Sequence, residues 1–178
     1  MTTRIAFLRA VNLGRRRVEN SRLVELVGGL GLDDVWAYIG SGNIVFSGPG
    51  RRVDLERSIG DTLEAAYGFE VTTFVRTAAE LATALRQEPF EVSDGDTYFI
   101  TFLGTVPTVA QATALEALSN DFDTLVVRGR DVHWHMSGRS TDSRLAKRDW
   151  ERILGGNTST SRNTTMLRKL AAKIADRR

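Results

Sequence analysis

The chain has 178 residues, of which 42% are hydrophobic and 26% are charged, values close to those of globular proteins and unlike those of disordered or fibrous chains. Because it contains no cysteine, the sequence excludes disulfide bonds, thiolate nucleophiles and thiolate zinc sites. No apolar run reaches the roughly 18 residues that a membrane-spanning helix requires. Residues 1–14 lack the pattern of a secretory signal, so we expect a cytoplasmic protein with no membrane partner.

The formal net charge of +2 conceals three segments of different charge. Residues 1–53 carry 8 basic and 4 acidic side chains, residues 54–127 carry 3 and 13, and residues 128–178 carry 13 and 5. Only 3 of the 24 basic side chains are lysines, so arginine is preferred throughout the chain. A cluster of arginines is therefore weaker evidence of function here than in a lysine-rich protein.

The first predicted elements are a strand and a helix. Residues 4–11 are apolar, with β-branched and aromatic members, and predict a mostly buried strand. From Ser21 to Leu30 the apolar residues keep helical spacing. Either Asn20 or Ser21 can serve as N-cap, and Gly31 is a suitable stop.

A hairpin, a second helix and a further strand follow. In "VWAYIGSGNIVFSG" two apolar runs, residues 35–39 and 44–46, are separated by a glycine-rich tip and predict a β-hairpin. The next helix begins with Asp54 as its cap and ends at Gly68, and residues 70–76 form another strand. The first half therefore has the order β-α-β-β-α-β, which is that of a ferredoxin-like unit.

A connecting helix follows the first half. Thr77 and Glu80 have the spacing of a capping box, and the helix must end before Pro89.

The second half begins the same order again. A strand over residues 97–104, a helix over 108–118 and a hairpin over 124–136 precede a helix over 143–154 and a basic helix over 164–175. Between these two helices lies the polar segment "GGNTSTSRN". Either residues 158–161 form a short strand there, or the repeat is incomplete.

We therefore predict an α+β protein of two tandem ferredoxin-like subdomains. The first spans residues 1–77, a connecting helix and linker span 78–94, and the second spans 95–178. We expect the second subdomain to have an incomplete last strand and an extra C-terminal basic helix.

The loop after the first strand could bind an anion. Gly14 lets the backbone approach a ligand closely, the following helix start supplies amides, and Arg15, Arg16 and Arg17 carry forked donors suited to phosphate. The sequence has neither of the two common glycine-rich nucleotide cradles. The loop is either a solvated basic turn or a contact for an anion or nucleic acid.

Two further polar motifs allow a structural or a ligand role. The hairpin tip "GSGN" could present Ser41 and Asn43 to a ligand, although turns need such residues for their backbone conformation. In "TSTSRN", Arg162 and Asn163 precede the last helix, which Asn163 or a neighbouring hydroxyl can cap.

The segment "DVHWHM" contains both histidines of the chain. In a strand, Asp131, His133 and His135 lie on one face and apolar side chains lie on the other. Three ligands in a row on one strand are poorly disposed to surround an ion. We predict a solvated or partner-facing strip, no metal site and no cofactor.

Three motifs in this order, "FLRAVNLG", "YIGSGNIVFSG" and "TSRN" with "RKL", resemble the bacterial domain of unknown function family 1697 from Arg4 to about Leu170. The resemblance implies two ferredoxin-like subdomains and no established activity. The sequence departs from the family pattern after Gly14, where arginines replace glycine and lysine, and after Asn163, where Thr164 replaces an aromatic residue. The positions that match the family motifs are Arg9, Asn12, Gly14, Ser41, Gly42, Asn43, Arg162, Asn163, Lys169 and Leu170.

Three functions remain open. The first is a binding module for a phosphate-bearing ligand or RNA, the second is a protein-interaction or regulatory domain, and the third is an enzyme acting on a small anion. The enzyme is least favoured, because no motif residue is a histidine or carboxylate suited to acid-base catalysis. We expect the ligand-binding residues to share one pocket: Arg9, Asn12, Gly14, Ser41, Gly42, Asn43, Arg162 and Asn163.

Overall fold

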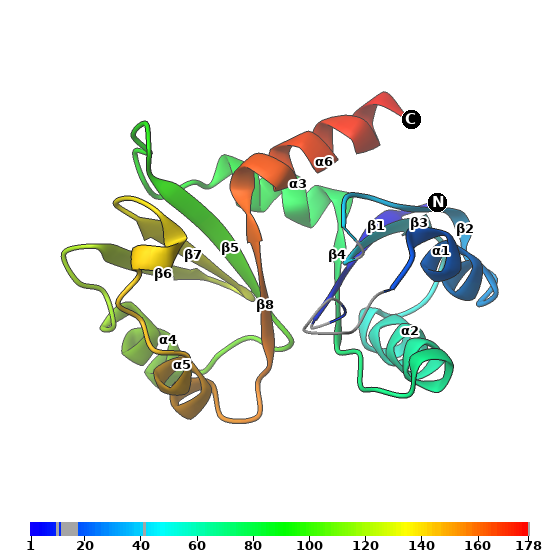
Figure 1. Cartoon of the computed structure of the whole chain (residues 1–178), viewed down its shortest axis with the longest axis horizontal. Helices are drawn as coiled ribbons and strands as arrows, with labels where there is room; N and C mark the ends of the chain where they lie inside the picture. Colours follow the sequence, from blue (N-terminus) through cyan, green and yellow to red (C-terminus); the bar gives the residue numbers. More distant parts are fainter. Residues whose placement is uncertain (10, 12–17, 41, 178) are drawn as a thin grey trace. The chain divides into compact units, whose positions relative to one another are not determined.

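The computed structural model describes the chain except for residues 10, 12–17, 41 and 178 (Figure 1). Within the described residues the protein is a mixed α+β structure with two four-stranded antiparallel sheets and six α-helices. The chain divides into two compact units, Met1–Ala82 and Thr83–Arg178, which are described separately. The division falls within helix α3 (Ala78–Arg86), which lies in the segment predicted to connect the two halves.

Unit 1 has the predicted order β-α-β-β-α-β. Its sheet has the strand order β2-β3-β1-β4, with every neighbouring pair antiparallel. The elements are β1 (Thr3–Leu8), α1 (Asn20–Gly28), β2 (Asp33–Ala37), β3 (Asn43–Ser47), α2 (Arg52–Tyr67) and β4 (Thr73–Thr77).

The unit 1 core lies where the two helices pack on the sheet. Apolar side chains recur at three- and four-residue spacing along α2, and the buried ones are Leu55, Ile59 and Leu63. They pack with Ala6 of β1 and Ile44 of β3. All five residues of β3 are buried, which explains why its three central residues are all apolar instead of alternating with polar ones.

The helix ends test the predicted caps. The Thr77 and Glu80 capping box is confirmed: the Thr77 amide donates to the Glu80 carboxylate at 2.7 Å, and the Glu80 amide donates to the Thr77 hydroxyl at 3.0 Å. Gly68 ends α2 in the left-handed conformation with φ 73°, as expected. The cap predicted at Asp54 is wrong, because α2 begins earlier and Asp54 lies in its first turn.

The N-cap of α1 also differs from the prediction. Asn20 is the first residue of the helix, and Glu19 is the N-cap, without a side-chain hydrogen bond to the helix amides. The helix ends at Gly28 instead of continuing to Leu30. Apolar spacing marks the buried face of a helix but does not mark where its backbone hydrogen bonds begin and end.

Unit 2 repeats the element order of unit 1, with the strand order β6-β7-β5-β8. Its elements after α3 are β5 (Thr97–Leu103), α4 (Val109–Glu116), β6 (Asp123–Arg128), β7 (Asp131–Met136), a 3-10 turn (Ser140–Asp142), α5 (Lys147–Leu154), β8 (Ser159–Asn163) and α6 (Thr164–Asp176). The extra C-terminal helix is therefore present as α6.

The expectation of an incomplete last strand in unit 2 is wrong. Strand β8 pairs with β5 over five residues, from Ser159 opposite Leu103 to Asn163 opposite Phe99. Its sequence, STSRN, contains no large apolar residue, so apolar patterning could not identify it. Pairing and the hydrogen bond between the Thr101 and Ser161 hydroxyls, at 2.7 Å, hold it in the sheet.

One face of the unit 2 sheet packs against α4 and α5. Trp150 of α5 and Leu115 of α4 meet Leu125 and Val132 of the sheet in one cluster. Gln111 joins the two helices: it completes the capping box of α4 with Thr108, and its side-chain amide donates to the Ile153 and Leu154 carbonyls at the end of α5. Among the described residues, no helix is both long enough and apolar enough to cross a membrane.

Candidate functional site

In unit 1, the end of β1 lies against the tip of the β2–β3 hairpin. The Leu8 amide donates to the Gly42 carbonyl at 2.8 Å, and the Arg9 amide donates to the Thr72 carbonyl at 2.9 Å. The backbone at Arg9 is therefore held between the hairpin and the segment that leads into β4. Arg9, Gly42 and Asn43 are brought together at this end of the sheet.

Asn43 holds the hairpin tip in place. Its side chain is 5% exposed, and its amide donates to the carbonyls of Tyr38 at 3.0 Å and Ile39 at 3.3 Å. Ile39 and Gly40 both have positive φ, 41° and 58°. A buried side-chain amide that binds two turn carbonyls supports the structural alternative for Asn43. Three other predicted residues, Asn12, Gly14 and Ser41, lie outside the described residues.

In unit 2, Arg162 and Asn163 end strand β8 and point to opposite faces of the sheet. The Arg162 guanidinium is partly buried and donates to the Thr160 hydroxyl at 2.8 Å and to the Ser161 carbonyl at 2.9 Å. Burial lowers the pKa of Arg162 to about 10, so the side chain still carries its charge at neutral pH. A charged group with reduced access to water interacts strongly with an anion.

Asn163 caps the last helix, as the sequence allowed. Its side-chain oxygen accepts a hydrogen bond from the Thr165 amide at 2.8 Å, at the start of α6. This bond accounts for Asn163 without a ligand. The structure thus places the described motif residues in two groups, one in each unit, and a pocket shared by both groups stays a prediction.

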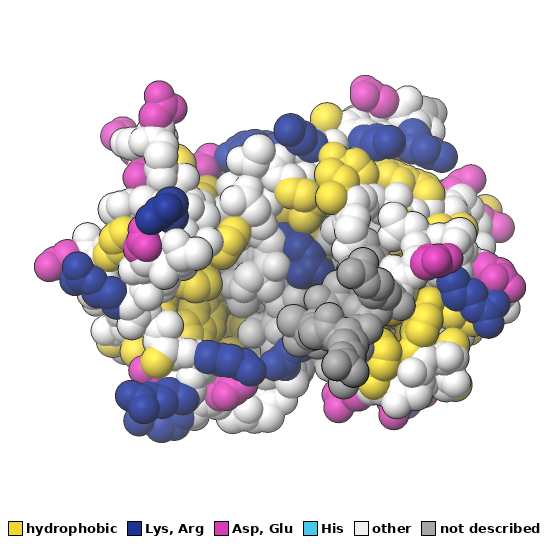
Figure 2. All heavy atoms as spheres, in the orientation of Figure 1, with side chains coloured by type: hydrophobic (Ala, Val, Ile, Leu, Met, Phe, Trp, Pro, Cys, Tyr) yellow, Lys and Arg dark blue, Asp and Glu magenta, His cyan; other side chains and the backbone are white. Residues whose placement is uncertain are grey.

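The outward face of α6 is basic. Arg168, Lys169, Lys173 and the following Arg177 are exposed, whereas the buried face consists of Thr164, Leu167, Leu170 and Ile174. Figure 2 shows Lys and Arg side chains gathered over this helix. Arg168 forms an ion pair with Glu88 at 2.5 Å, and within the described part of the chain Lys169 has no ion pair.

The expectation that Asp131, His133 and His135 form a solvated or partner-facing strip is wrong for the two histidines. His133 is 0% exposed, and its Nδ1 is hydrogen-bonded to the Tyr98 hydroxyl. His135 is half-buried, binds the Asp96 carboxylate through Nε2 at 2.9 Å and contacts the ring of Phe90.

Sequence reasoning missed this cluster because it considered β7 alone. The neighbouring strand carries Tyr98 and Ile100 directly opposite His135 and His133. Strand β5 has apolar residues on both of its faces. This pattern indicated that the sheet face carrying the two histidines is covered. In the described residues, no group of three or more His, Asp or Glu side chains could hold a metal ion.

Asp123 is a second group that the sequence did not single out. Its carboxylate is 0% exposed and accepts hydrogen bonds from the Ser143 hydroxyl at 2.7 Å, the Arg144 amide at 2.9 Å and the Trp134 indole at 2.9 Å. Burial by itself raises the pKa of Asp123, but these hydrogen bonds, with one from Asn120, outweigh it and lower the pKa. Asp123 therefore fixes the loop before α5.

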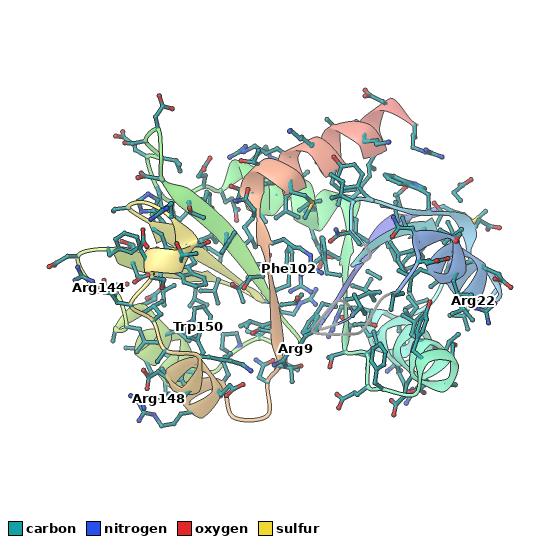
Figure 3. The ribbon with its side chains drawn as sticks, in the orientation of Figure 1. Arg9, Arg22, Phe102, Arg144, Arg148 and Trp150 are labelled. Carbon is teal, nitrogen blue, oxygen red and sulfur yellow. The ribbon has the colours of Figure 1, made fainter. Side chains whose placement is uncertain are left out.

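The side chains of this region point in different directions (Figure 3). Trp150 lies between α5 and the sheet, whereas Arg144 and Arg148 are exposed. The buried carboxylate thus has a structural role, and the loop that it fixes carries the exposed Arg144.

Comparison with known proteins gives a family and a fold. Residues 1–133 match the family described as "Protein of unknown function (DUF1697)". No curated protein matches the chain. The chain is also similar to the solved structure of "conserved bacterial protein SP0830 from Streptococcus pneumoniae", with 18% identity, 98% of this chain and 99% of that chain covered, and a TM-score of 0.73. At this identity the likeness concerns the fold.

Proposed function

Since the chain belongs to the DUF1697 family, whose description assigns no function, we propose from its own residues that it is a binding module for a phosphate-bearing ligand, with RNA as the favoured candidate. The observation that carries the proposal is the basic outward face of α6. Four exposed cations, Arg168, Lys169, Lys173 and Arg177, follow one another over about three turns, and Asp176 is the only acidic residue of the helix.

The spacing of these cations suits a linear polyanion. Lys169, Lys173 and Arg177 are four residues apart, so they lie on one face of the helix at steps of about 6 Å along its axis. Such a row can contact successive phosphates of a single strand, and each contact releases a counterion.

The motif residues form the second part of the proposal. We infer that Arg9, Asn12, Gly14, Ser41, Gly42 and Arg162 bind the same ligand or a small anion, while the side chains of Asn43 and Asn163 hold the hairpin tip and cap α6. Support comes from the partly buried Arg162 guanidinium, whose forked N–H donors suit phosphate oxygens.

We also infer the finer description of the fold and location. Both units follow the order β-α-β-β-α-β with the last strand beside the first, which supports two ferredoxin-like subdomains with boundaries at residues 1–77, 78–94 and 95–178. The cysteine-free sequence supports a reducing, cytoplasmic location.

The binding proposal is tested by fluorescence anisotropy with mixed single-stranded RNA oligomers over a series of salt concentrations. We expect binding at low salt that weakens as salt rises. Replacing both Lys169 and Lys173 by Ala should weaken binding to all sequences and reduce the slope of log K against log salt by about 0.7 for each lysine that contacts phosphate.

The matched control replaces two cations elsewhere on unit 2. Arg144 and Arg148 are exposed and lie outside α6, so their double replacement by Ala removes the same charge without touching the proposed surface. Equal losses of RNA affinity in both double variants would mean that RNA binding depends only on the net charge of the protein. Absence of RNA binding at low salt, or binding that salt does not change, would refute the RNA proposal, and a parallel titration with inorganic phosphate tests a small-anion ligand.

One observation favours a protein-interaction domain as the second candidate. Val106 is 66% exposed and precedes α4, and Val109, the first residue of α4, is 85% exposed. Two exposed β-branched residues this close together form a small apolar contact surface. The test replaces both valines by Ser and measures capture of a protein partner. If capture is lost while RNA binding is unchanged, the two valines belong to a protein-interaction surface.

A further inference from the structure

Each sheet ends on a strand that could pair with another chain. In unit 2 the strand order makes β6 an edge strand. An edge strand offers backbone donors and acceptors to any extended segment, and proteins protect such edges with charged side chains, bulges or covering elements. The central residues of β6, Thr124–Val127, carry no charge and have high β propensity, so their own side chains give little protection.

Side chains from the end of α4 cover the outer edge of β6. The Val127 amide donates to the Glu116 carboxylate at 2.8 Å, and the Leu125 amide donates to the Ser119 hydroxyl at 3.0 Å. Alternate residues of a strand direct their amides to the same side, so these are two successive amides of the same edge. Glu116 is the last residue of α4, and its carbonyl accepts from the Ser119 amide at 3.1 Å, so both acceptors belong to one local structure.

In unit 1, glutamate side chains cover the outward amides of the edge strand β4 in a similar way. The Val75 amide donates to Glu56 of α2 at 2.9 Å, and the Thr77 amide donates to Glu80 of α3 at 2.7 Å. Arg52 fixes the Glu56 side chain through an ion pair at 2.5 Å. Glutamate side chains therefore occupy outward amides of one edge strand in each sheet, and they come from different helices.

We propose that Glu116 and Ser119 keep β6 from pairing with β6 of a second copy of this chain. Two identical antiparallel strands related by a two-fold axis present the same outward amides and carbonyls to each other, so each can satisfy the other. The uncharged centre of β6 offers no like-charge repulsion against this pairing. The Glu116 carboxylate prevents the pairing because it occupies the Val127 amide that the second copy would need.

The test compares two substitutions of Glu116 in the full chain. Glu116→Ala removes the acceptor and should give a mass that rises toward twice that of the wild-type species as protein concentration increases. Glu116→Gln keeps a side-chain oxygen that can accept from the Val127 amide, so it should keep the wild-type mass. Sedimentation equilibrium measures both, and far-UV circular dichroism verifies that each variant is folded.

A second substitution tests whether β6 is the surface through which copies of the Glu116→Ala variant associate. Val127→Pro removes the outward amide, whose hydrogen bond goes to Glu116 and not to β7, and proline is tolerated on edge strands. Added to Glu116→Ala, it should restore the wild-type mass. If the double variant still associates, another surface is responsible and the proposal is wrong.

The proposal is equally wrong if Glu116→Ala keeps the wild-type mass at all concentrations. Should Glu116→Ala lose its native circular dichroism spectrum, Glu116→Asp replaces it, because the shorter side chain withdraws the carboxylate from the Val127 amide while keeping the charge. A wild-type mass for a folded Glu116→Asp variant would then overturn the proposal. The masses of these variants do not test the proposed RNA binding, which is assigned to α6.

Discussion

His133 is fully buried, and its two ring nitrogens have different environments. Nδ1 is hydrogen-bonded to the Tyr98 hydroxyl, and Nε2 is buried without a hydrogen-bond partner among the described residues. Burial raises the pKa of Tyr98, so the hydroxyl keeps its proton and can donate a hydrogen bond to Nδ1 of a neutral His133. Burial, with a smaller effect from the charge of Arg128, lowers the pKa of His133 to about 4.

This shift predicts that stability falls in mild acid. An unfolded histidine has a pKa of about 6.5, so between about pH 6.5 and pH 4 the unfolded state binds a proton that the folded state does not. The free energy of unfolding should therefore be highest above about pH 6.5 and should fall by about 2 kcal/mol between pH 7 and pH 5. Urea unfolding at a series of pH values measures this slope.

Substitution separates His133 from the only other histidine. His133→Gln cannot titrate and should flatten the pH dependence between about pH 5 and pH 7, whereas His135→Gln should retain it. The Asp96 carboxylate that binds His135 has a lowered pKa, caused first by that hydrogen bond, so its contribution is lost only at more acidic pH. A slope that survives in His133→Gln would contradict the assignment.

Helix α2 packs very closely on the segment before β4. A Cβ atom added at Gly60 would lie 3.0 Å from the Val71 carbonyl oxygen, a backbone atom that cannot move away as a side chain can. We expect Gly60→Ala to lower the free energy of unfolding by on the order of 1 kcal/mol, because crowding outweighs the better helix propensity of alanine. Denaturant unfolding gives the value.

The matched control lies at the end of α1. At Gly28 no described atom beyond its chain neighbours and the backbone of its own helix lies within 4 Å of the position of an added Cβ, and its backbone does not require glycine. Gly28→Ala should leave stability unchanged or raise it by up to about 1 kcal/mol. If Gly60→Ala stabilises the protein as much as Gly28→Ala, helix α2 and the segment before β4 can move apart more easily than their close packing implies.

At the scale of the whole molecule, each unit has a hydrophobic cluster of its own. Leu63 belongs to the cluster of unit 1 and Leu115 to that of unit 2, and both are 0% exposed. Replacing either by Ala should lower stability by about 2–5 kcal/mol. Amide hydrogen exchange should show the greatest loss of protection in the unit that carries the substitution, because its sheet loses the packing that holds it. Equal loss in both units would contradict this expectation.

The sequence by itself determined the order of elements in both halves, apart from strand β8, and the buried faces of most of them. Apolar spacing identified α2, the hairpins and the basic helix α6, and the Thr77 and Glu80 spacing identified the start of α3. These features are local, because helical and strand periodicity depend on residues a few positions apart. The α+β class followed from the same local patterns, whereas the family was indicated by the resemblance of three sequence motifs.

Only the tertiary structure decided which polar residues are buried. Strand β8 has no apolar pattern and exists because β5 pairs with it, and His133 is buried because of what surrounds its strand. Asp123 likewise gains its hydrogen bonds from Trp134 and Ser143, residues 11 and 20 positions away. Pairing and burial depend on contacts between residues distant in the sequence, and a polar side chain carries no local sign of the partner that will satisfy it.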